Sequence, residues 1–337
     1  MPRLKDVPPR FASTAREIVD PLHTRVSSNC RRTVFPYGFP VHIRSNSRLV
    51  LEAAELSWGT YRQQFSLPAL DVRCFVSDTE SPACVEPPQF RSQAHLLSIV
   101  ADHENFACLD LEQGFSFGWV TRNTARSTEY FRQCFLDVMI YPLLEIEYLI
   151  TLHAACVMFN RKGVLLAGPS GAGKSSLAYA CARSGWTYVS DDASAFFRRA
   201  AIPEVIGHPH RFRFREPVAE LFPEFSDRTS SLRAYGKPTI EVQTATLSGL
   251  QTASGSSIDC IIFLNRYEAP SGPPRLRQLS AEEAWKRLLP SVWAVQLPAL
   301  QERLDALQKL LDLPIYEMQY LEFPPAIDML KDLTKTL

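Results

Sequence analysis

Short apolar runs separated by turn residues dominate the first third of the chain. Between residues 41 and 120 these runs are rich in β-branched and aromatic side chains, which is typical of strands. They lie at residues 41–43, 72–76, 95–100, 106–111 and 115–120. We therefore expect a small, mostly β N-terminal domain, which we assign to residues 1–125.

The period of the apolar positions changes near Ser127. From there apolar side chains recur at spacings of three and four, which places them on one face of a helix. These positions are Phe131, Phe135, Val138, Met139, Pro142 and Leu143. The helix should lead into a second domain, residues 126–337.

Strands and helices alternate through this second domain. We expect strands at 149–159, 164–167, 186–190, 195–198, 238–243, 258–265 and 315–320, and helices at 175–183, 280–289, 300–311 and 326–333. A tight turn at 160–163 joins the first two strands, and a capping box at 280–283 opens a helix. The pattern predicts a mixed α/β domain, and 337 residues are enough for two separate cores.

Composition narrows the partners of the chain. Lysine plus arginine equals aspartate plus glutamate at 36 each, so no net field draws the molecule to nucleic acid or to an anionic membrane. Charged and polar residues interrupt the longest apolar region, so we expect no membrane span. The eight cysteines are scattered without metal-site spacing, which fits free thiols in a cytoplasmic protein.

One segment carries a phosphate-binding motif. Residues 168–175, GPSGAGKS, match G-x-x-x-x-G-K-[ST] between an apolar strand and a helix. Glycines there permit backbone N–H groups to turn toward phosphate oxygens, and the helix adds the positive end of its dipole. A glycine-rich turn without a ligand is the alternative. We assign nucleotide binding to Gly168, Ser170, Gly171, Ala172, Gly173, Lys174, Ser175 and Ser176.

Two residues of the motif have distinct expected tasks. Lys174 is placed to reach the β- and γ-phosphates, and the hydroxyl of Ser175 can bind Mg²⁺. The expected cofactors are therefore ATP and Mg²⁺.

Asp191 and Asp192 follow the strand predicted after the motif helix. Adjacent strand residues face opposite sides, so the two carboxylates cannot share one role. One can accept a hydroxyl proton or orient the attacking oxygen, and the other can bind Mg²⁺. A solvated Asp-Asp turn is the alternative, which the nearby phosphate motif makes less attractive.

Other polar residues carry weaker signals. His153 lies within the strand before the motif strand, where a lone histidine is usually structural. Glu204 could supply a further metal carboxylate. Arg211, Arg213 and Arg215 alternate and would form one basic face, most often a salt-bridged surface and less often a phosphate contact. Lys237 and Arg266 are further candidates for balancing transition-state charge.

Residues 149–265 resemble the catalytic domain of the HPr kinase/phosphorylase family. The resemblance rests on the His153 segment, the motif at 168–176 and Ser190-Asp191-Asp192 in this order. It implies the phosphoenolpyruvate-carboxykinase-like P-loop fold and oligomer formation. Asp191 would match the general base, Asp192 its partner at the metal with Ser175, and His153 the histidine near the transferred phosphate.

A shorter stretch matches the same family only in part. Residues 204–207, EVIG, are similar to the family's Glu-Ile-Arg-Gly signature, but Ile206 stands where the signature has arginine. Glu204 would correspond to the glutamate of that signature and is the third metal-ligand candidate, beside Ser175 and Asp192.

The resemblance implies transfer of the γ-phosphate of ATP to a serine hydroxyl. Residues 1–125 do not match the regulatory domain of the HPr enzyme, and its phosphorolysis signature is not apparent, so HPr itself is not implied as the substrate. We expect a kinase for a protein or peptide acceptor. A small-molecule kinase on the same fold and a nucleotide-gated ATPase without phosphotransfer remain the alternatives.

Overall fold

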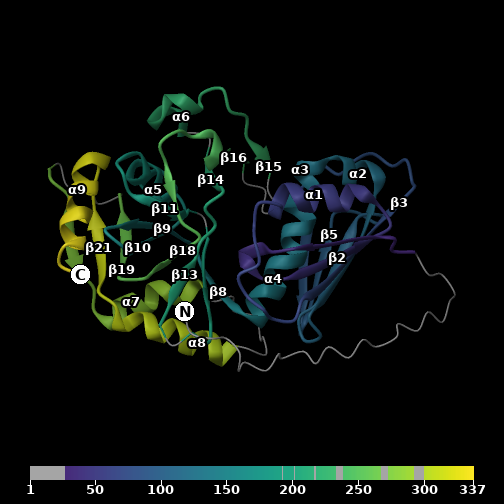
Figure 1. The fold of residues 1–337 in the computed structure, drawn as a ribbon, viewed down its shortest axis with the longest axis horizontal. Coiled ribbons are helices and arrows are strands. Elements are labelled where there is room, and N and C mark those ends of the chain that lie inside the picture. The colour runs from purple at the N-terminus through teal and green to yellow at the C-terminus, as the bar shows by residue number, and fades with distance from the viewer. Residues whose placement is uncertain are drawn as a thin grey trace. The chain divides into compact units, whose positions relative to one another are not determined.

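The computed structural model describes residues 27–191, 193–200, 202–215, 218–232, 238–266, 272–291 and 300–337 (Figure 1). The chain forms two compact units, and the first division falls after Glu147 instead of at residue 125. The boundary is later because the helix that follows Ser127 packs on the first sheet: a Cβ added to Gly118 would lie 3.0 Å from the Met139 side chain. The predicted connecting helix thus belongs to the first unit.

The first unit contains a seven-stranded sheet in the order β1-β2-β3-β7-β6-β5-β4. All five apolar runs predicted as strands are strands of this sheet, since their alternate side chains are buried. The strands are β1 (Cys30–Val34), β2 (Val41–Ser45), β3 (Leu70–Ser77), β4 (Gln89–Gln93), β5 (Leu96–Val100), β6 (Phe106–Asp110) and β7 (Phe115–Thr121).

Helices also belong to this unit. Helix α1 (Arg48–Trp58) was not predicted from the sequence. It is capped by Ser47, whose side chain accepts a hydrogen bond from the Leu49 N–H. The predicted helix after Ser127 is confirmed. It comprises α3 (Thr128–Phe131), a π-helical turn (Arg132–Leu136) and α4 (Asp137–Glu147), preceded by α2 (Arg122–Arg126).

The second unit is built around a mixed seven-stranded sheet in the order β17-β11-β9-β10-β19-β21-β20. Strands β10, β19 and β21 are mutually parallel, and β9 is antiparallel to both of its neighbours, β10 and β11. The strands are β9 (Ala154–Phe159), β10 (Lys162–Ala167), β11 (Thr187–Ser190), β17 (Gln251–Thr252), β19 (Cys260–Asn265), β20 (Arg275–Gln278) and β21 (Ile315–Gln319).

A second sheet of this unit has the order β18-β13-β12-β8. The run predicted as one strand at 149–159 is divided between the two sheets, because the chain bends at His153. The strands are β8 (Leu149–Leu152), β12 (Ser194–Phe197), β13 (Glu204–Ile206) and β18 (Gly255–Ser257). A further antiparallel pair joins β14 (Arg211–Phe214) to β16 (Pro238–Gln243), and β15 (Ser231–Leu232) is grouped with the first unit.

Alternate residues of β10 enter two different cores. Val164 and Leu166 pack with apolar residues of α5 (Lys174–Arg183) and α9 (Phe323–Thr334) on one face. Leu165 and Ala167 pack toward α7 (Ala281–Leu288) and α8 (Leu300–Gln308) on the other. Figure 1 shows these helix pairs on opposite sides of the central sheet. Because helices cover both faces of the sheet, a ligand is expected to bind at the edge formed by the strand ends.

A third core fixes the β14–β16 pair beside α5. It contains Tyr179 of α5 together with Phe212 and Phe214 of β14. The short helix α6 (Val218–Leu221) adds Val218 to the same core. Tyr179 meets both phenylalanine rings edge-on, at centroid distances of 5.3 and 5.6 Å. The position of β14 is therefore set by the helix that follows the phosphate motif.

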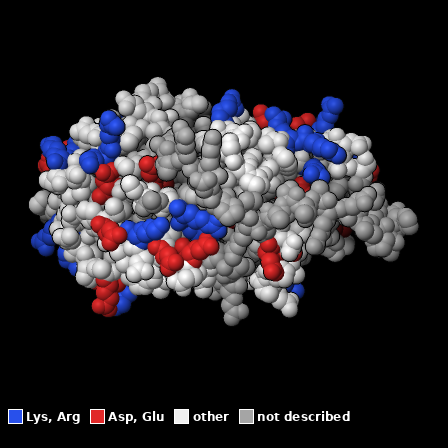
Figure 2. Space-filling model, turned by 60° about the horizontal axis from the view of Figure 1, so that its bottom comes forward, with Lys and Arg blue, Asp and Glu red and all other residues white. Residues whose placement is uncertain are grey.

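Charged side chains of both signs are interleaved on the described part of the face in Figure 2. Among the described residues, ion pairs such as Lys286–Glu282, at 2.6 Å, and Arg277–Glu283, at 2.8 Å, join side chains of opposite charge. Opposite charges thus neutralise each other within these pairs, as they do in the composition of the whole chain.

Two further sequence expectations concern the whole chain. Each of the eight cysteines is a free thiol, as predicted. Burial raises the pKa of the Cys74 thiol to about 12. Within the described ranges, we find no helix with both the length and the apolar character needed to cross a bilayer.

Candidate functional site: a phosphate loop at the strand ends

Five strands of the central sheet point in the same direction, so their carboxyl ends share one edge: these are β10, β11, β17, β19 and β21. Gly168 follows β10, Asp191 follows β11, Arg266 follows β19 and Tyr320 follows β21. Ligands of open α/β sheets bind outside such carboxyl ends. The edge therefore brings together residues that are far apart in the sequence.

The predicted phosphate motif lies at this edge as a loop between β10 and α5. Gly168, Gly171 and Gly173 have φ angles of 144°, 91° and 90°, which side chains with a Cβ rarely adopt. A Cβ at Gly168 would also lie 3.1 Å from the carbonyl oxygen of Leu264, on the neighbouring strand β19. The backbone shape favours glycine at all three positions, and close packing favours it further at Gly168.

Lys174 is the first residue of α5 and is buried, with 6% of its surface exposed. Its ammonium donates hydrogen bonds to the carbonyl oxygens of Gly168, at 2.9 Å, and Pro169, at 3.1 Å. The ammonium thus lies against the first half of the loop, where phosphate oxygens could replace these carbonyls as acceptors.

The remaining loop residues present small polar or apolar side chains. Ser170 and Gly171 are exposed, whereas Ala172 is buried and its N–H donates to the Pro169 carbonyl at 3.1 Å. Ser175 and Ser176 lie in the first turn of α5, which begins at Lys174. The hydroxyl of Ser175 is an oxygen donor of the kind Mg²⁺ prefers.

Asp191 is held in a fixed position at the end of β11. Only 5% of the residue is exposed, and its Oδ2 atom accepts a hydrogen bond from the Arg213 backbone N–H at 2.6 Å. Beside it, the hydroxyls of Ser190 and Ser194 lie 2.7 Å apart, and Ser194 donates to the Ala154 carbonyl at 2.9 Å. Asp192 lies outside the described residues, so its predicted role stays a prediction.

His153 lies at the bend where the chain passes from β8 to β9, not inside a strand as the sequence suggested. Its side chain is exposed. In β9, Ala154 is paired with Ala167 of β10, and Cys156 with Ser190 of β11. The register therefore places His153 beside the start of the phosphate loop and at the same end as Asp191.

The structure does not bring Glu204 to this group. Glu204 is exposed and begins β13, where it pairs with Ser257. The other end of β13, at Ile206, pairs with Ala195, which is the side nearer Asp191. Strands rise about 3.3 Å per residue, so Glu204 lies farther along β13, away from the loop.

The three alternating arginines have separate environments. Arg211 and Arg213 both reach Glu241 on β16, at 3.1 and 3.4 Å, which matches the salt-bridged alternative weighed for this stripe. Arg215, one residue beyond β14, instead donates a hydrogen bond to the Ser170 hydroxyl in the phosphate loop.

Arg266 and Tyr320 form the wall behind Gly173. A Cβ at Gly173 would lie 2.8 Å from the Tyr320 hydroxyl and 3.2 Å from Cδ of Arg266. The Arg266 guanidinium lies 5.6 Å from the Tyr320 ring centroid, and burial raises the pKa of the Tyr320 phenol. Lys237, the other charge candidate, lies outside the described residues.

Two residues near the site could not be predicted from any sequence motif. Tyr320 is the last residue of the predicted strand 315–320, and His208 lies in the short irregular stretch between β13 and β14. The His208 N–H donates to the Val189 carbonyl at 2.9 Å, two residues before Asp191. Burial first, and then the Arg211 and Arg213 charges, lower the pKa of His208 well below its ordinary value, so the imidazole is neutral.

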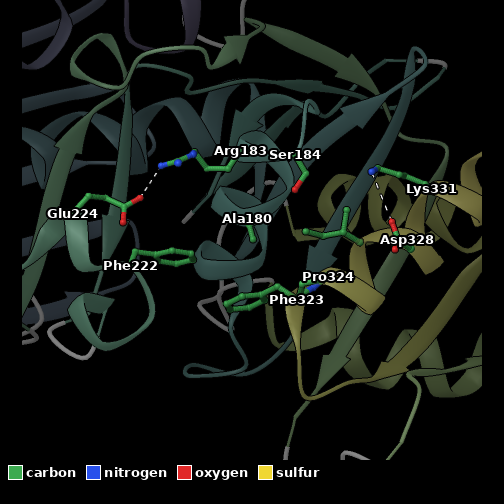
Figure 3. Close-up of a pocket in the computed structure, with 10 residues that line it drawn as sticks. Ala180, Arg183, Ser184, Phe222, Glu224, Phe323, Pro324, Asp328 and Lys331 are labelled. Carbon is green, nitrogen blue, oxygen red and sulfur yellow. Dashed lines mark hydrogen bonds and ion pairs between the residues drawn. The ribbon is translucent and has the colours of Figure 1, made fainter.

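A cleft of about 430 Å³ lies elsewhere, along the second half of α5 (Figure 3). Phe222 and Phe323 line it, and its charges occur as the pairs Arg183–Glu224, at 2.7 Å, and Lys331–Asp328, at 3.8 Å. The predicted site residues are not among those that line it. The phosphate loop and this cleft are separate features of the second unit.

Comparisons with known proteins add little to this geometry. No protein-family model matches the chain, and no curated protein matches it. Among solved structures, the Hpr(Ser) kinase/phosphatase from Coxiella burnetii is similar at 15% identity and a TM-score of 0.29, over 55% of this chain and 88% of that one. Neither the fold nor the activity of this chain follows from so low a similarity.

Proposed function

We propose that this protein is an ATP-dependent kinase that transfers the γ-phosphate to a hydroxyl group, with serine in a protein or peptide as the acceptor. The observation that supports this most is the meeting of a complete phosphate loop and a buried carboxylate at one edge of one sheet. Asp191 follows β11 at the same edge where Gly168 follows β10. A pure nucleotide switch has less need of a base beside its phosphate site than an enzyme that phosphorylates a hydroxyl group.

The loop would bind the phosphates through its backbone and through Lys174. The N-terminus of α5 favours negative charge, and the Lys174 ammonium can exchange the carbonyl oxygens of Gly168 and Pro169 for oxygens of the β- and γ-phosphates. Ser175 would hold Mg²⁺ together with a carboxylate such as Asp192, and the ion would supply charge neutralisation at the phosphates.

Asp191 would receive the proton of the acceptor. The acceptor oxygen forms a bond to the γ-phosphorus while the bond to the β,γ-bridging oxygen breaks, so that ADP leaves. The hydroxyl proton passes to the Asp191 carboxylate, whose orientation is fixed by the Arg213 N–H at 2.6 Å. His153, exposed beside the loop, would contact the transferred phosphate.

Two further parts of the proposal concern how the acceptor is selected and whether copies of the chain associate. We assign acceptor selection to the mostly β first unit, and the association of several copies of the chain follows from the resemblance to the HPr kinase/phosphorylase family. Size-exclusion chromatography with light scattering tests the association directly: a monomer at all concentrations would contradict it.

Incubation with γ-labelled ATP, serine peptides and cell lysate tests the function. Label that enters a protein or peptide supports the proposal, and label that enters a metabolite supports the small-molecule kinase instead. Release of free phosphate alone, unchanged in the Asp191→Asn variant, would eliminate both kinases in favour of a nucleotide-gated ATPase. Asp259→Asn is the matched control, because Asp259 contacts Lys162 and Gly163 at the opposite end of β10.

A further inference from the structure

Arg215 differs from the two arginines that precede it in the alternating stripe. Arg211 and Arg213 have 6% and 11% of their side chains exposed, and Glu241 compensates both charges. Arg215 is exposed, and no carboxylate in the described parts of the chain lies within ion-pair distance of it. The one described hydrogen bond of its guanidinium goes to the neutral hydroxyl of Ser170.

This environment leaves most of the guanidinium available. Arginine carries five N–H donors in a planar fork that matches two phosphate oxygens. One hydroxyl occupies only a small part of that capacity. A cation that lies against an exposed loop residue, with no carboxylate of the described residues to compensate it, is in a position where an anionic ligand would stabilise it.

The position along the loop indicates which phosphate this cation would reach. Ser170 lies in the first half of the loop, next to Gly168 and Pro169, whose carbonyls bind the Lys174 ammonium. Lys174 is the residue placed to reach the β- and γ-phosphates. The helix end of the loop, from Gly173, would hold the phosphates nearer the nucleoside, so Arg215 lies at the terminal-phosphate end.

Strand β14, which Arg215 follows directly, also forms a hydrogen bond with Asp191, the expected proton acceptor. The Arg213 N–H binds Asp191, and Phe212 and Phe214 are buried against Tyr179 of α5. Arg215 is therefore positioned by the same rigid strand that positions Asp191. A change at Arg215 itself should leave that packing intact, because its side chain is exposed.

We propose that Arg215 binds the γ-phosphate of the nucleotide and is the residue by which the site distinguishes a nucleoside triphosphate from a diphosphate. This inference rests on the nucleotide site of the proposed function. It adds a phosphate-binding residue from outside the loop motif, on a strand that the motif does not predict.

Equilibrium binding of ADP and of a non-hydrolysable ATP analogue, each with Mg²⁺, tests the proposal. We expect Arg215→Ala to weaken the triphosphate analogue about 10- to 100-fold and ADP less than about threefold, because a charged hydrogen bond to the terminal phosphate is lost. The affinity of Arg215→Lys for the triphosphate analogue should lie between those of the wild type and of Arg215→Ala. Arg161→Ala is the control, since Arg161 is an exposed arginine in the turn at the far end of β10.

Equal weakening of both nucleotides by Arg215→Ala, or no weakening, would overturn this inference while leaving the nucleotide site in place. A wild-type protein that binds neither nucleotide would overturn the nucleotide site as well. Repeating the measurement in a Ser170→Ala background separates direct binding from an effect on loop shape. The selectivity change should persist there, and its disappearance would show that Arg215 acts only through Ser170.

Discussion

The two ends of strands β9, β10 and β19 are built in opposite ways. At one end the β9–β10 turn is closed: Lys162 forms an ion pair with Asp259 at 3.0 Å, and the Asp259 carboxylate also accepts from the Gly163 N–H at 2.9 Å. At the other end the chain forms a glycine loop, and the Lys174 ammonium contacts the carbonyls of that loop. The strands between them are mostly buried.

The two ends differ in whether an incoming phosphate can replace the hydrogen-bond acceptors of the lysine. An aspartate fixed by several donors keeps its lysine, so the closed end contributes to stability. Loop carbonyls are neutral acceptors that an incoming phosphate can replace at a gain in charge-assisted bonding. The contrast separates a structural lysine, Lys162, from Lys174, which we propose binds phosphate, within a single strand–loop unit.

Exchange of each lysine for alanine should give the largest contrast. We expect Lys174→Ala to reduce phosphoryl transfer at least about 1000-fold, because the charge at the phosphates is lost. Lys162→Ala should leave the turnover number nearly unchanged and lower the thermal stability. Steady-state kinetics and thermal melts of both variants provide the measurement; unchanged ATP turnover in Lys174→Ala would contradict the role of the loop.

Asp191→Asn should have the next largest effect. Removal of a proton acceptor from the loop end is expected to lower transfer to the acceptor about 100-fold, while nucleotide affinity changes little. Asp259→Asn is the counterpart at the closed end and should not change the transfer rate. A transfer rate in Asp191→Asn equal to that of the wild type would show that the proton has another destination.

Two glycine-to-alanine changes should separate stability from binding. A Cβ at Gly163 would lie 1.8 Å from the Ser257 carbonyl oxygen, so we expect a loss of about 3 kcal/mol in unfolding free energy. That loss corresponds to a decrease in Tm of about 6–12 °C. Gly173→Ala should instead weaken nucleotide binding tenfold or more, roughly, since its φ of 90° and the Tyr320 hydroxyl leave no room for a Cβ. A Gly173→Ala protein with wild-type affinity would contradict this assignment.

Acid should weaken the closed end in a defined pH range. Burial alone would raise the pKa of Asp259, but hydrogen bonds from Ser257, the Gly163 N–H and Lys162 outweigh it and hold the pKa below its ordinary value of 3.8. The contribution of Asp259 to stability is therefore complete above pH 3.8 and is lost as pH falls through the lower folded-state pKa. The difference in Tm between wild type and Asp259→Asn should be constant near neutral pH and disappear below that range.

Local patterns were enough to predict much of the second unit. The phosphate loop, the turn at Asn160 and Arg161, and the capping box at Ser280 each depend on a few neighbouring residues, and all three have the expected backbone or hydrogen bonds. Helix α1 was missed because its short amphipathic stretch lies between β-like runs.

The sequence did not predict which residues distant along the chain lie close together in space. The alternation that made 149–159 one strand gave no sign that the chain changes sheets at His153. The contact of Arg215 with Ser170 joins positions 45 residues apart, and it depends on how β14 packs against α5. The position of Glu204 away from the loop likewise follows only from the register of β13.

The close fit of Gly168 against Leu264 has a consequence for the order of folding. The β9–β10 hairpin is local and can close early, whereas the β10–β19 pairing joins distant segments and closes at a higher entropic cost. A nascent chain that ends before Cys260 contains the whole loop motif but lacks the strand on which Gly168 rests. We therefore expect nucleotide affinity to appear only after β19 has been synthesised and has paired with β10.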